Sequence, residues 1–158
     1  MLNKMPPNTS INSVLSHLEN TTKWGARNRA LFAFRQVFRI RDISALRVAD
    51  VLNLDTSIRK FYIAEDGTRF ELTSDLQDEV HRYLISKFNL TGNSLEPLIK
   101  TNLNVPLFPT QKRAKFSNNT LAQHYSLLDK NIRQHFTAVK QATKKPSMSQ
   151  RLLSSFAG

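Results

Sequence analysis

The sequence predicts a single, mainly α-helical domain that carries a small β hairpin. Apolar residues recur at helical spacing over most of the chain, and a short middle segment instead reads as two β-rich runs around an Asp-Gly pair. The length of 158 residues is typical of one globular domain, and a hydrophobic content of 40% is enough for one core. We therefore expect helices, one hairpin and then further helices.

The N-terminal part predicts helices only. Residues 6–10 (Pro-Pro-Asn-Thr-Ser) are typical of a helix start and lead into apolar residues at helical spacing over residues 11–18. A second helix is predicted over residues 25–39, where Leu31, Phe34 and Phe38 form one apolar stripe. Residues 42–47 predict one more short helical turn.

In the middle of the chain the helical spacing of apolar residues gives way to β-rich runs. Asp66-Gly67 separates two β-rich runs, and this dipeptide is a strong signal for a hairpin turn. Thr73-Ser74-Asp75 then predicts the capped start of a third helix. Residues 94–117 are predicted to be a loop that is punctuated by prolines. A long final helix is predicted to begin at residues 117–120 and to continue through Phe136.

The charge of the chain is strongly positive and unevenly distributed. The net charge is +11, with a pI near 10.4. From Pro97 onward there are ten Lys or Arg residues and one acid, Asp129, whereas the first 96 residues hold 13 bases and 11 acids. Such a field favours a polyanion, and nucleic acid gains most from the release of counterions. A ribosome-associated or simply soluble basic protein is the alternative.

Several classes of site are not expected. Without cysteine there can be no disulfide, thiolate metal site or cysteine nucleophile. The histidines at positions 17, 81, 124 and 135 lack metal-ligand spacing, and the glycines form no phosphate-binding loop, so we expect no metal and no cofactor. No apolar run reaches the length of a membrane span or a signal peptide, so we expect a cytoplasmic protein without a membrane partner.

One long stretch resembles a known family. It runs from Arg27-Asn28-Arg29 through Arg39 and Asp42 to Leu46-Arg47-Val48-Ala49-Asp50. This order is similar to the first conserved box of the tyrosine recombinases, or phage integrases. The resemblance spans residues 22–136 and implies a recombinase catalytic-domain-like fold. It places Arg39 on the family's first catalytic arginine and Asp42 on its acidic partner, whereas spacing alone would favour an ordinary i,i+3 surface ion pair.

The sequence departs from that family at its catalytic positions. The turn Ala64-Glu65-Asp66-Gly67 lacks the lysine that the family carries in this hairpin. Lys130 and Arg133 weakly match the family's second arginine box, or else belong to the helix before a box that is absent. No tyrosine follows Arg133, so the family's nucleophile is missing. The tyrosines at positions 62, 83 and 125 are expected to be core or half-buried residues.

The sequence therefore predicts a catalytically inactive, recombinase-like DNA-binding protein, an accessory factor or regulator of site-specific recombination in a mobile element. Its domain would be residues 1–143, followed by a basic tail, residues 144–158. The vestigial catalytic candidates are Arg39, Asp42 and Arg133. The candidate DNA-binding residues are Arg39, Arg41, Arg47, Lys112, Arg113, Lys115, Lys130, Arg133, Lys140, Lys144 and Lys145. In the tail Leu152, Leu153 and Phe156 could dock onto a full-length recombinase, such as an Xer-type enzyme.

The sequence leaves two alternative functions open. The chain could be a DNA-binding regulator of transcription or replication that has no recombinase partner. It could also be a fragment of an active tyrosine recombinase, with the nucleophile lost by truncation or supplied by another subunit.

Overall fold

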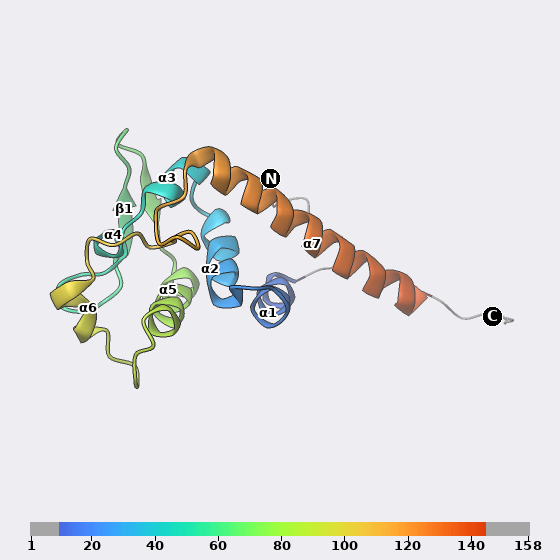
Figure 1. Ribbon diagram of the computed structural model, residues 1–158, viewed down its shortest axis with the longest axis horizontal. Coiled ribbons are helices and arrows are strands. Elements are labelled where there is room, and N and C mark those ends of the chain that lie inside the picture. The colour runs from blue at the N-terminus through green and yellow to red at the C-terminus, as the bar shows by residue number, and fades with distance from the viewer. Residues whose placement is uncertain (1–9, 145–158) are drawn as a thin grey trace, which may run out of the picture.

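The computed structural model describes the backbone of residues 10–144 and the side chains of residues 10–138. Within these residues the chain is mainly helical, with one two-stranded antiparallel sheet (Figure 1), so the predicted combination of helices and a small hairpin is confirmed. The elements are α1 (Ile11–Thr21), α2 (Gly25–Arg35), α3 (Ile40–Ala45), α4 (Val48–Val51), β1 (Phe61–Ile63), β2 (Arg69–Glu71), α5 (Ser74–Lys87), α6 (Glu96–Thr101) and α7 (Asn118–Lys144).

Helices α1 and α2 approach each other closely at Gly25. A Cβ atom at this position would lie 2.1 Å from the backbone oxygen of Glu19, so only glycine allows this approach. The turn between the helices is held by the buried Asn28 amide, which donates to Thr22 Oγ1 at 3.0 Å and to the Lys23 carbonyl at 2.9 Å. The α1–α2 pair thus forms a fixed corner of the domain.

Helix α2 begins at Gly25 as predicted but ends at Arg35, so the prediction that it continues to residue 39 is wrong. Phe38 is only 1% exposed and turns into the core, with its ring 5.2 Å from that of Phe34 and 5.0 Å from that of Phe70 on the hairpin. This packing overrides the helical periodicity, as tertiary contacts often do. The chain bends after Arg35, and Arg39 becomes the N-cap of α3.

The short helical turn predicted over residues 42–47 is present as α3, which begins and ends two residues earlier, and a second short helix, α4, follows it. The break lies at Leu46 and Arg47, which are both extended. The carbonyl of Leu46 accepts the Leu107 N–H at 2.9 Å, so a later segment of the chain fills the break. The Asp50 carboxylate accepts the Arg47 N–H at 2.8 Å and thereby caps α4.

The hairpin has the turn that its Asp-Gly pair predicts. Phe61 pairs with Glu71, and Tyr62 with Phe70, in an antiparallel register. Gly67 has a φ of +87°, a left-handed conformation that glycine adopts at little cost. Tyr62 and Phe70 pack against the core, whereas Phe61 lies on the exposed face of the strand.

The segment predicted as a loop over residues 94–117 contains the helix α6, so that prediction is wrong in part. Pro97 stands in the first turn of α6, where the missing N–H of proline costs nothing and its fixed φ suits the helix. The predicted cap of α5 is confirmed, because Thr73 Oγ1 accepts the Leu76 N–H at 3.3 Å.

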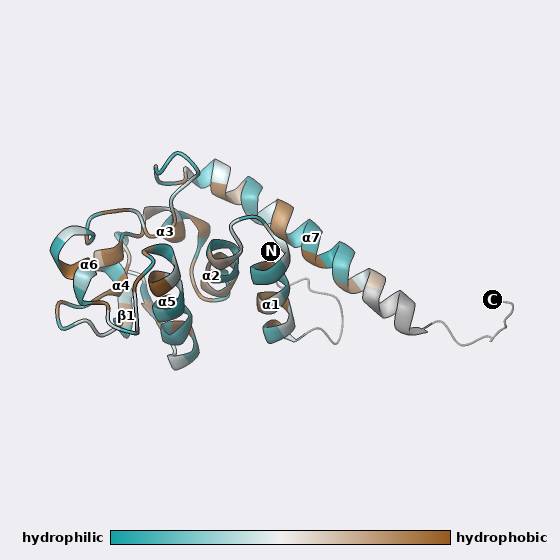
Figure 2. Cartoon of the chain, turned by 60° about the horizontal axis from the view of Figure 1, so that its bottom comes forward, coloured by the Kyte–Doolittle hydropathy of each residue, from teal (hydrophilic) through white to brown (hydrophobic). Residues whose placement is uncertain are grey.

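Helix α7 lies across the other helices and extends past them at its C-terminal end (Figure 1). Figure 2 shows hydrophobic and hydrophilic residues alternating along it, as expected of a helix with one buried stripe. The beginning of α7 is tied to α3, since Ser44 Oγ donates to Asn118 Oδ1 at 2.5 Å. The buried stripe joins the common core through Leu121, Tyr125, Leu128 and Ile132.

Two adjacent leucines test this packing of α7. Leu128 is 4% exposed and Leu127 is 66% exposed. We expect Leu128→Ala to lower the free energy of unfolding by about 2–5 kcal/mol, because it leaves a cavity in the core. Leu127→Ala should change it by less than about 0.5 kcal/mol. Urea unfolding of both variants measures the difference, and equal effects would contradict the packing of α7.

Candidate nucleic-acid interface

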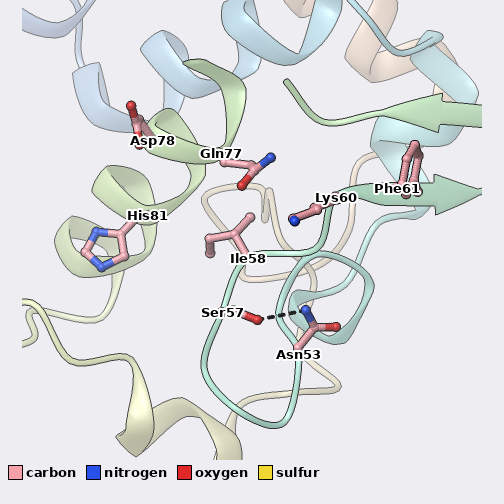
Figure 3. A pocket seen from close by; sticks show the side chains of 8 residues that line it. All are labelled: Asn53, Ser57, Ile58, Lys60, Phe61, Gln77, Asp78 and His81. Atoms are coloured by element: carbon pink, nitrogen blue, oxygen red, sulfur yellow. Dashed lines mark hydrogen bonds between the residues drawn. The ribbon is translucent and has the colours of Figure 1, made fainter. Parts of the chain in front are cut away.

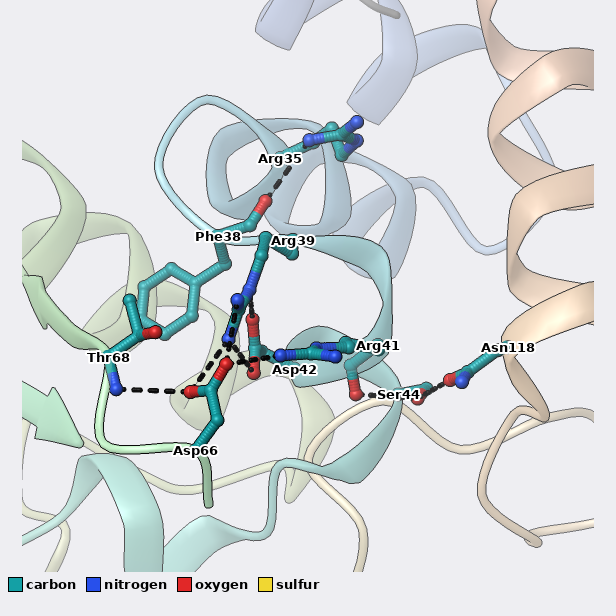
Figure 4. A network of polar contacts seen from close by, with 9 residues as sticks. All are labelled: Arg35, Phe38, Arg39, Arg41, Asp42, Ser44, Asp66, Thr68 and Asn118. Atoms are coloured by element: carbon teal, nitrogen blue, oxygen red, sulfur yellow. Dashed lines mark hydrogen bonds and ion pairs between the residues drawn. The ribbon is translucent and has the colours of Figure 1, made fainter. Parts of the chain in front are cut away.

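The two arginines at the start of α3 are held by carboxylates (Figure 4). Arg39 Nε donates to Asp42 Oδ2 at 2.6 Å, and Arg39 Nη2 donates to Asp42 Oδ1 at 3.2 Å. Arg39 also donates to both oxygens of Asp66, at 3.1 and 3.3 Å. Arg41 pairs with the same Asp66, which further accepts the Thr68 N–H at 3.0 Å. Asp66 thus links the hairpin turn to α3.

This arrangement balances the charge of the predicted recombinase-like site. Arg39 and Arg41 supply two positive charges, and Asp42 and Asp66 supply two negative ones. The pKa of Arg39 is raised by its hydrogen bonds to Asp42 and Asp66, and the pKa of Asp66 is lowered by its hydrogen bond from Arg39. A phosphate could reach Arg39 only in competition with Asp66.

The i,i+3 pair of Arg39 and Asp42 differs from an ordinary surface ion pair. The Asp42 side chain is only 7% exposed, whereas that of Arg39 is 38% exposed. The Arg39 guanidinium also lies 5.2 Å from the centre of the Phe70 ring. Contacts on three sides therefore fix the direction of Arg39.

Arg133 is placed in a different part of the domain. It lies on α7 and pairs with Asp129 at 3.0 Å. It is 15 positions beyond Asn118, which is roughly 22 Å along the helix axis at 1.5 Å per residue. In this region α7 contacts α1, where His17 Nε2 lies 2.6 Å from Asn131 Oδ1. The structure brings Arg39 and Asp42 together but does not bring Arg133 to them.

The hydroxyls of Tyr83 and Tyr125 form hydrogen bonds within the fold. Tyr83 is buried and donates to the Leu107 carbonyl at 2.8 Å, and Tyr125 is buried and donates to the Leu31 carbonyl at 2.5 Å. Burial raises the pKa of both phenols, and burial together with Asp50 and other acids raises that of Tyr62. Each phenol thus keeps its proton more firmly than a free tyrosine would.

The segment before α7 forms a tight basic loop. Pro109 and Lys115 form an antiparallel bridge, and the Thr110 N–H donates to the Ala114 carbonyl at 2.7 Å. Arg113 has a φ of +63° and donates its N–H to the Thr110 carbonyl at 2.9 Å. We call residues 109–115 the basic loop. Its charged side chains are exposed and form no ion pair with any described residue: Lys112, Arg113 and Lys115.

The other predicted DNA-binding residues are dispersed. Arg47 is exposed at the start of α4, opposite Pro106, and Lys130 is exposed on α7. Lys140 and Lys144 belong to the last turns of α7, where only the backbone is described. The remaining predicted residues lie outside the described part of the chain: Lys145, Leu152, Leu153 and Phe156.

The sequence reasoning missed three residues next to the basic loop. Trp24, Arg27 and Lys87 line a hollow that also includes Arg113. A signal for Trp24 was present, because the single tryptophan of the chain stands between a lysine and a glycine. Lys87 stands on the buried stripe of α5, four positions after Tyr83, and it reaches this hollow only through the tertiary fold.

A second hollow, of about 490 Å³, lies between the segment before β1 and helix α5 (Figure 3). It includes one base and one acid, Lys60 and Asp78, so its formal charge is balanced. Asn53 Nδ2 donates to Ser57 Oγ at 2.9 Å on its wall. Among the described residues no group of three His, Cys, Asp or Glu side chains could hold a metal ion.

The chain matches no protein-family model, no curated protein and no solved structure. The relation to the tyrosine recombinases therefore stays a prediction from the residue pattern. None of the described helices is long and apolar enough to cross a membrane.

His124 is partly buried on α7, and its Nε2 lies 2.8 Å from Asn28 Oδ1. Burial and then the charge of Arg27 lower the pKa of His124 from 6.5 to about 4. Between these values the unfolded chain binds the proton and the folded chain does not. The contribution of neutral His124 to the free energy of unfolding is therefore fully present above pH 6.5 and is lost as the pH falls toward 4.

We expect the melting temperature to fall between pH 7.5 and 5, and to fall less in His124→Gln, whose amide can donate to Asn28 but does not titrate. Differential scanning fluorimetry of both proteins measures this. Identical pH profiles would contradict the buried, neutral state of His124.

Proposed function

We propose that the chain is a non-catalytic, recombinase-like DNA-binding protein that acts as an accessory factor or regulator of site-specific recombination. The observation that carries the proposal is the basic loop, whose exposed bases Lys112, Arg113 and Lys115 have no carboxylate partner in the described structure. Unpaired, solvent-facing bases of this kind suit contacts to the phosphate backbone, which add affinity without reading sequence.

The contrast with five other arginines supports this choice of surface. Arg29 pairs with Glu19 and Glu79, and Arg82 pairs with Glu19. Arg39, Arg41 and Arg133 pair with aspartates. A phosphate that binds a paired arginine must displace a carboxylate and gains less than it does at an unpaired one. We therefore place the DNA on the basic loop and on the adjacent start of α7.

Two observations support the absence of catalysis. The phenols of Tyr83 and Tyr125 are buried and donate to backbone carbonyls, so neither is placed to attack a phosphate. Asp66 occupies the guanidinium face of Arg39 that a phosphate would need. The recombination role itself rests on the order of residues from Arg27 to Asp50 and on the hairpin that follows.

The basic loop predicts the salt dependence of DNA binding. Replacing Lys112, Arg113 and Lys115 by Ala should weaken duplex binding and reduce the slope of log K against log salt by about 2 to 3, at about 0.9 per lost phosphate contact. The matched control replaces three exposed bases elsewhere, Lys60, Arg69 and Lys100, and removes the same charge. Fluorescence anisotropy between low and moderate salt measures both slopes. A slope unchanged in the loop variant, or changed equally in the control, would place the DNA elsewhere.

The proposed accessory role can be tested with a suicide DNA substrate, which traps any covalent recombinase–DNA intermediate. A purified Xer-type recombinase is incubated with the substrate, with and without this chain. We expect adducts only at the mass of the recombinase, formed at a rate that this chain alters. An adduct on this chain would refute the non-catalytic proposal, and an unaltered rate with every recombinase tested would refute the accessory role.

A further inference from the structure

The hollow beside the basic loop contains bases but no acid. It has a volume of about 820 Å³, within the range of about 300–1,000 Å³ that is common for ligand sites. Its walls come from the start of α2, the end of α5 and the segment between α6 and α7. Arg27, Lys87 and Arg113 line it, and none of its lining residues is Asp or Glu. We call this hollow the basic groove.

Arg27 is the least satisfied charge in this groove. Its Nη1 donates to the Pro109 carbonyl at 3.2 Å, but its buried Nε has no hydrogen-bond partner. The guanidinium lies near two aromatic rings, 5.8 Å from the centre of the Trp24 ring and 5.4 Å from that of Phe116. Burial lowers its pKa, since no carboxylate offsets the loss of hydration. The guanidinium charge therefore has no acidic partner among the described residues, and an anion in the groove would compensate it.

Lys87, at the end of α5, is a second partly buried base in this groove that has no acidic partner in the described structure. Its ammonium lies 5.0 Å from the centre of the Phe88 ring. Burial lowers its pKa as well. Together with Arg113, three like charges border one hollow without compensation, an arrangement that a phosphate would stabilise.

Trp24 adds a flat apolar surface to the groove. It is 49% exposed although it is the only tryptophan of the chain. Its φ of +63° is left-handed, which is uncommon for a large side chain. The close approach of α1 and α2 at Gly25 holds the backbone in this corner. An exposed indole beside unpaired bases is the combination on which unpaired nucleotides stack.

We propose that the basic groove binds single-stranded DNA, with an unpaired base stacked on Trp24 and the neighbouring phosphate held by Arg27, Lys87 and Arg113. This inference rests on the proposed DNA-binding function and adds a second contact to it. The groove is continuous with the basic loop through Arg113, so a strand on the loop can extend into the groove. This continuity favours a polynucleotide over a free nucleotide.

The single tryptophan gives a direct measurement. The full chain is titrated with an oligothymidylate, with a duplex of the same length and with thymidine monophosphate, while the emission of Trp24 is recorded. We expect the oligothymidylate to quench this emission because its bases stack on the indole. The duplex should bind through the basic loop with little quenching, and the mononucleotide should bind far more weakly than the oligonucleotide.

Variants then separate the groove from the loop, with labelled DNA and anisotropy as the readout. Trp24→Gly removes the ring and suits the left-handed backbone, so it should not disturb the fold. It should weaken oligothymidylate binding about tenfold, the effect of losing one stacked base. Lys87→Gln should weaken it several-fold, and Lys100→Gln, an exposed lysine on α6, should leave it unchanged. Duplex binding should stay constant in all three variants.

The outcomes distinguish the groove from the general DNA-binding function. If the duplex binds but the oligothymidylate neither quenches Trp24 nor responds to Trp24→Gly and Lys87→Gln, the groove inference is wrong and the proposed function stands. If thymidine monophosphate binds as tightly as the oligonucleotide, the occupant is a free nucleotide and the inference is wrong. If neither DNA binds, both proposals fail.

Discussion

The insertion of Phe38 between α2 and the hairpin is the contact on which the rest of the structure depends. Its ring packs against Phe34 and Phe70, and this position ends α2 and turns the chain into α3. The same turn brings Arg39 next to the hairpin, where Asp66 meets it. The packing of Phe38 therefore fixes both the bend between α2 and α3 and the position of the ion pairs around Arg39.

Two groups of bases in the described part of the chain have different physical roles. Arginines such as Arg29 and Arg39 form ion pairs with carboxylates, mainly those of other elements, and these pairs connect the elements and largely neutralise the arginines. The bases of the basic loop and the basic groove have no such partners among the described residues and supply a local positive field. Net charge alone does not locate a nucleic-acid surface, because paired and unpaired bases contribute equally to it.

Local patterns predicted much of the fold, and long-range contacts account for what they missed. The Asp-Gly turn at Gly67, the cap at Thr73 and the stripe of α7 follow from neighbours in the sequence. The end of α2 depends on Phe70, more than thirty positions away, and Arg39 meets Asp66 across 27 positions. The same holds for the candidate site. The cluster of bases in the basic loop can be read from the sequence, whereas the basic groove forms only when three separate segments of the chain come together in the fold.

The central claim is that DNA contacts the unpaired bases near α7 and avoids the balanced cluster around Arg39. Two-dimensional ¹H–¹⁵N NMR, with a duplex that carries a single-stranded overhang, tests it most directly. We expect the largest shifts in the amides of residues 110–117, the indole of Trp24 and the Nε–H of Arg27, with little change at Arg39 or Asp66. Shifts concentrated at Arg39 and Asp66, with the residues of the basic loop unmoved, would contradict the claim.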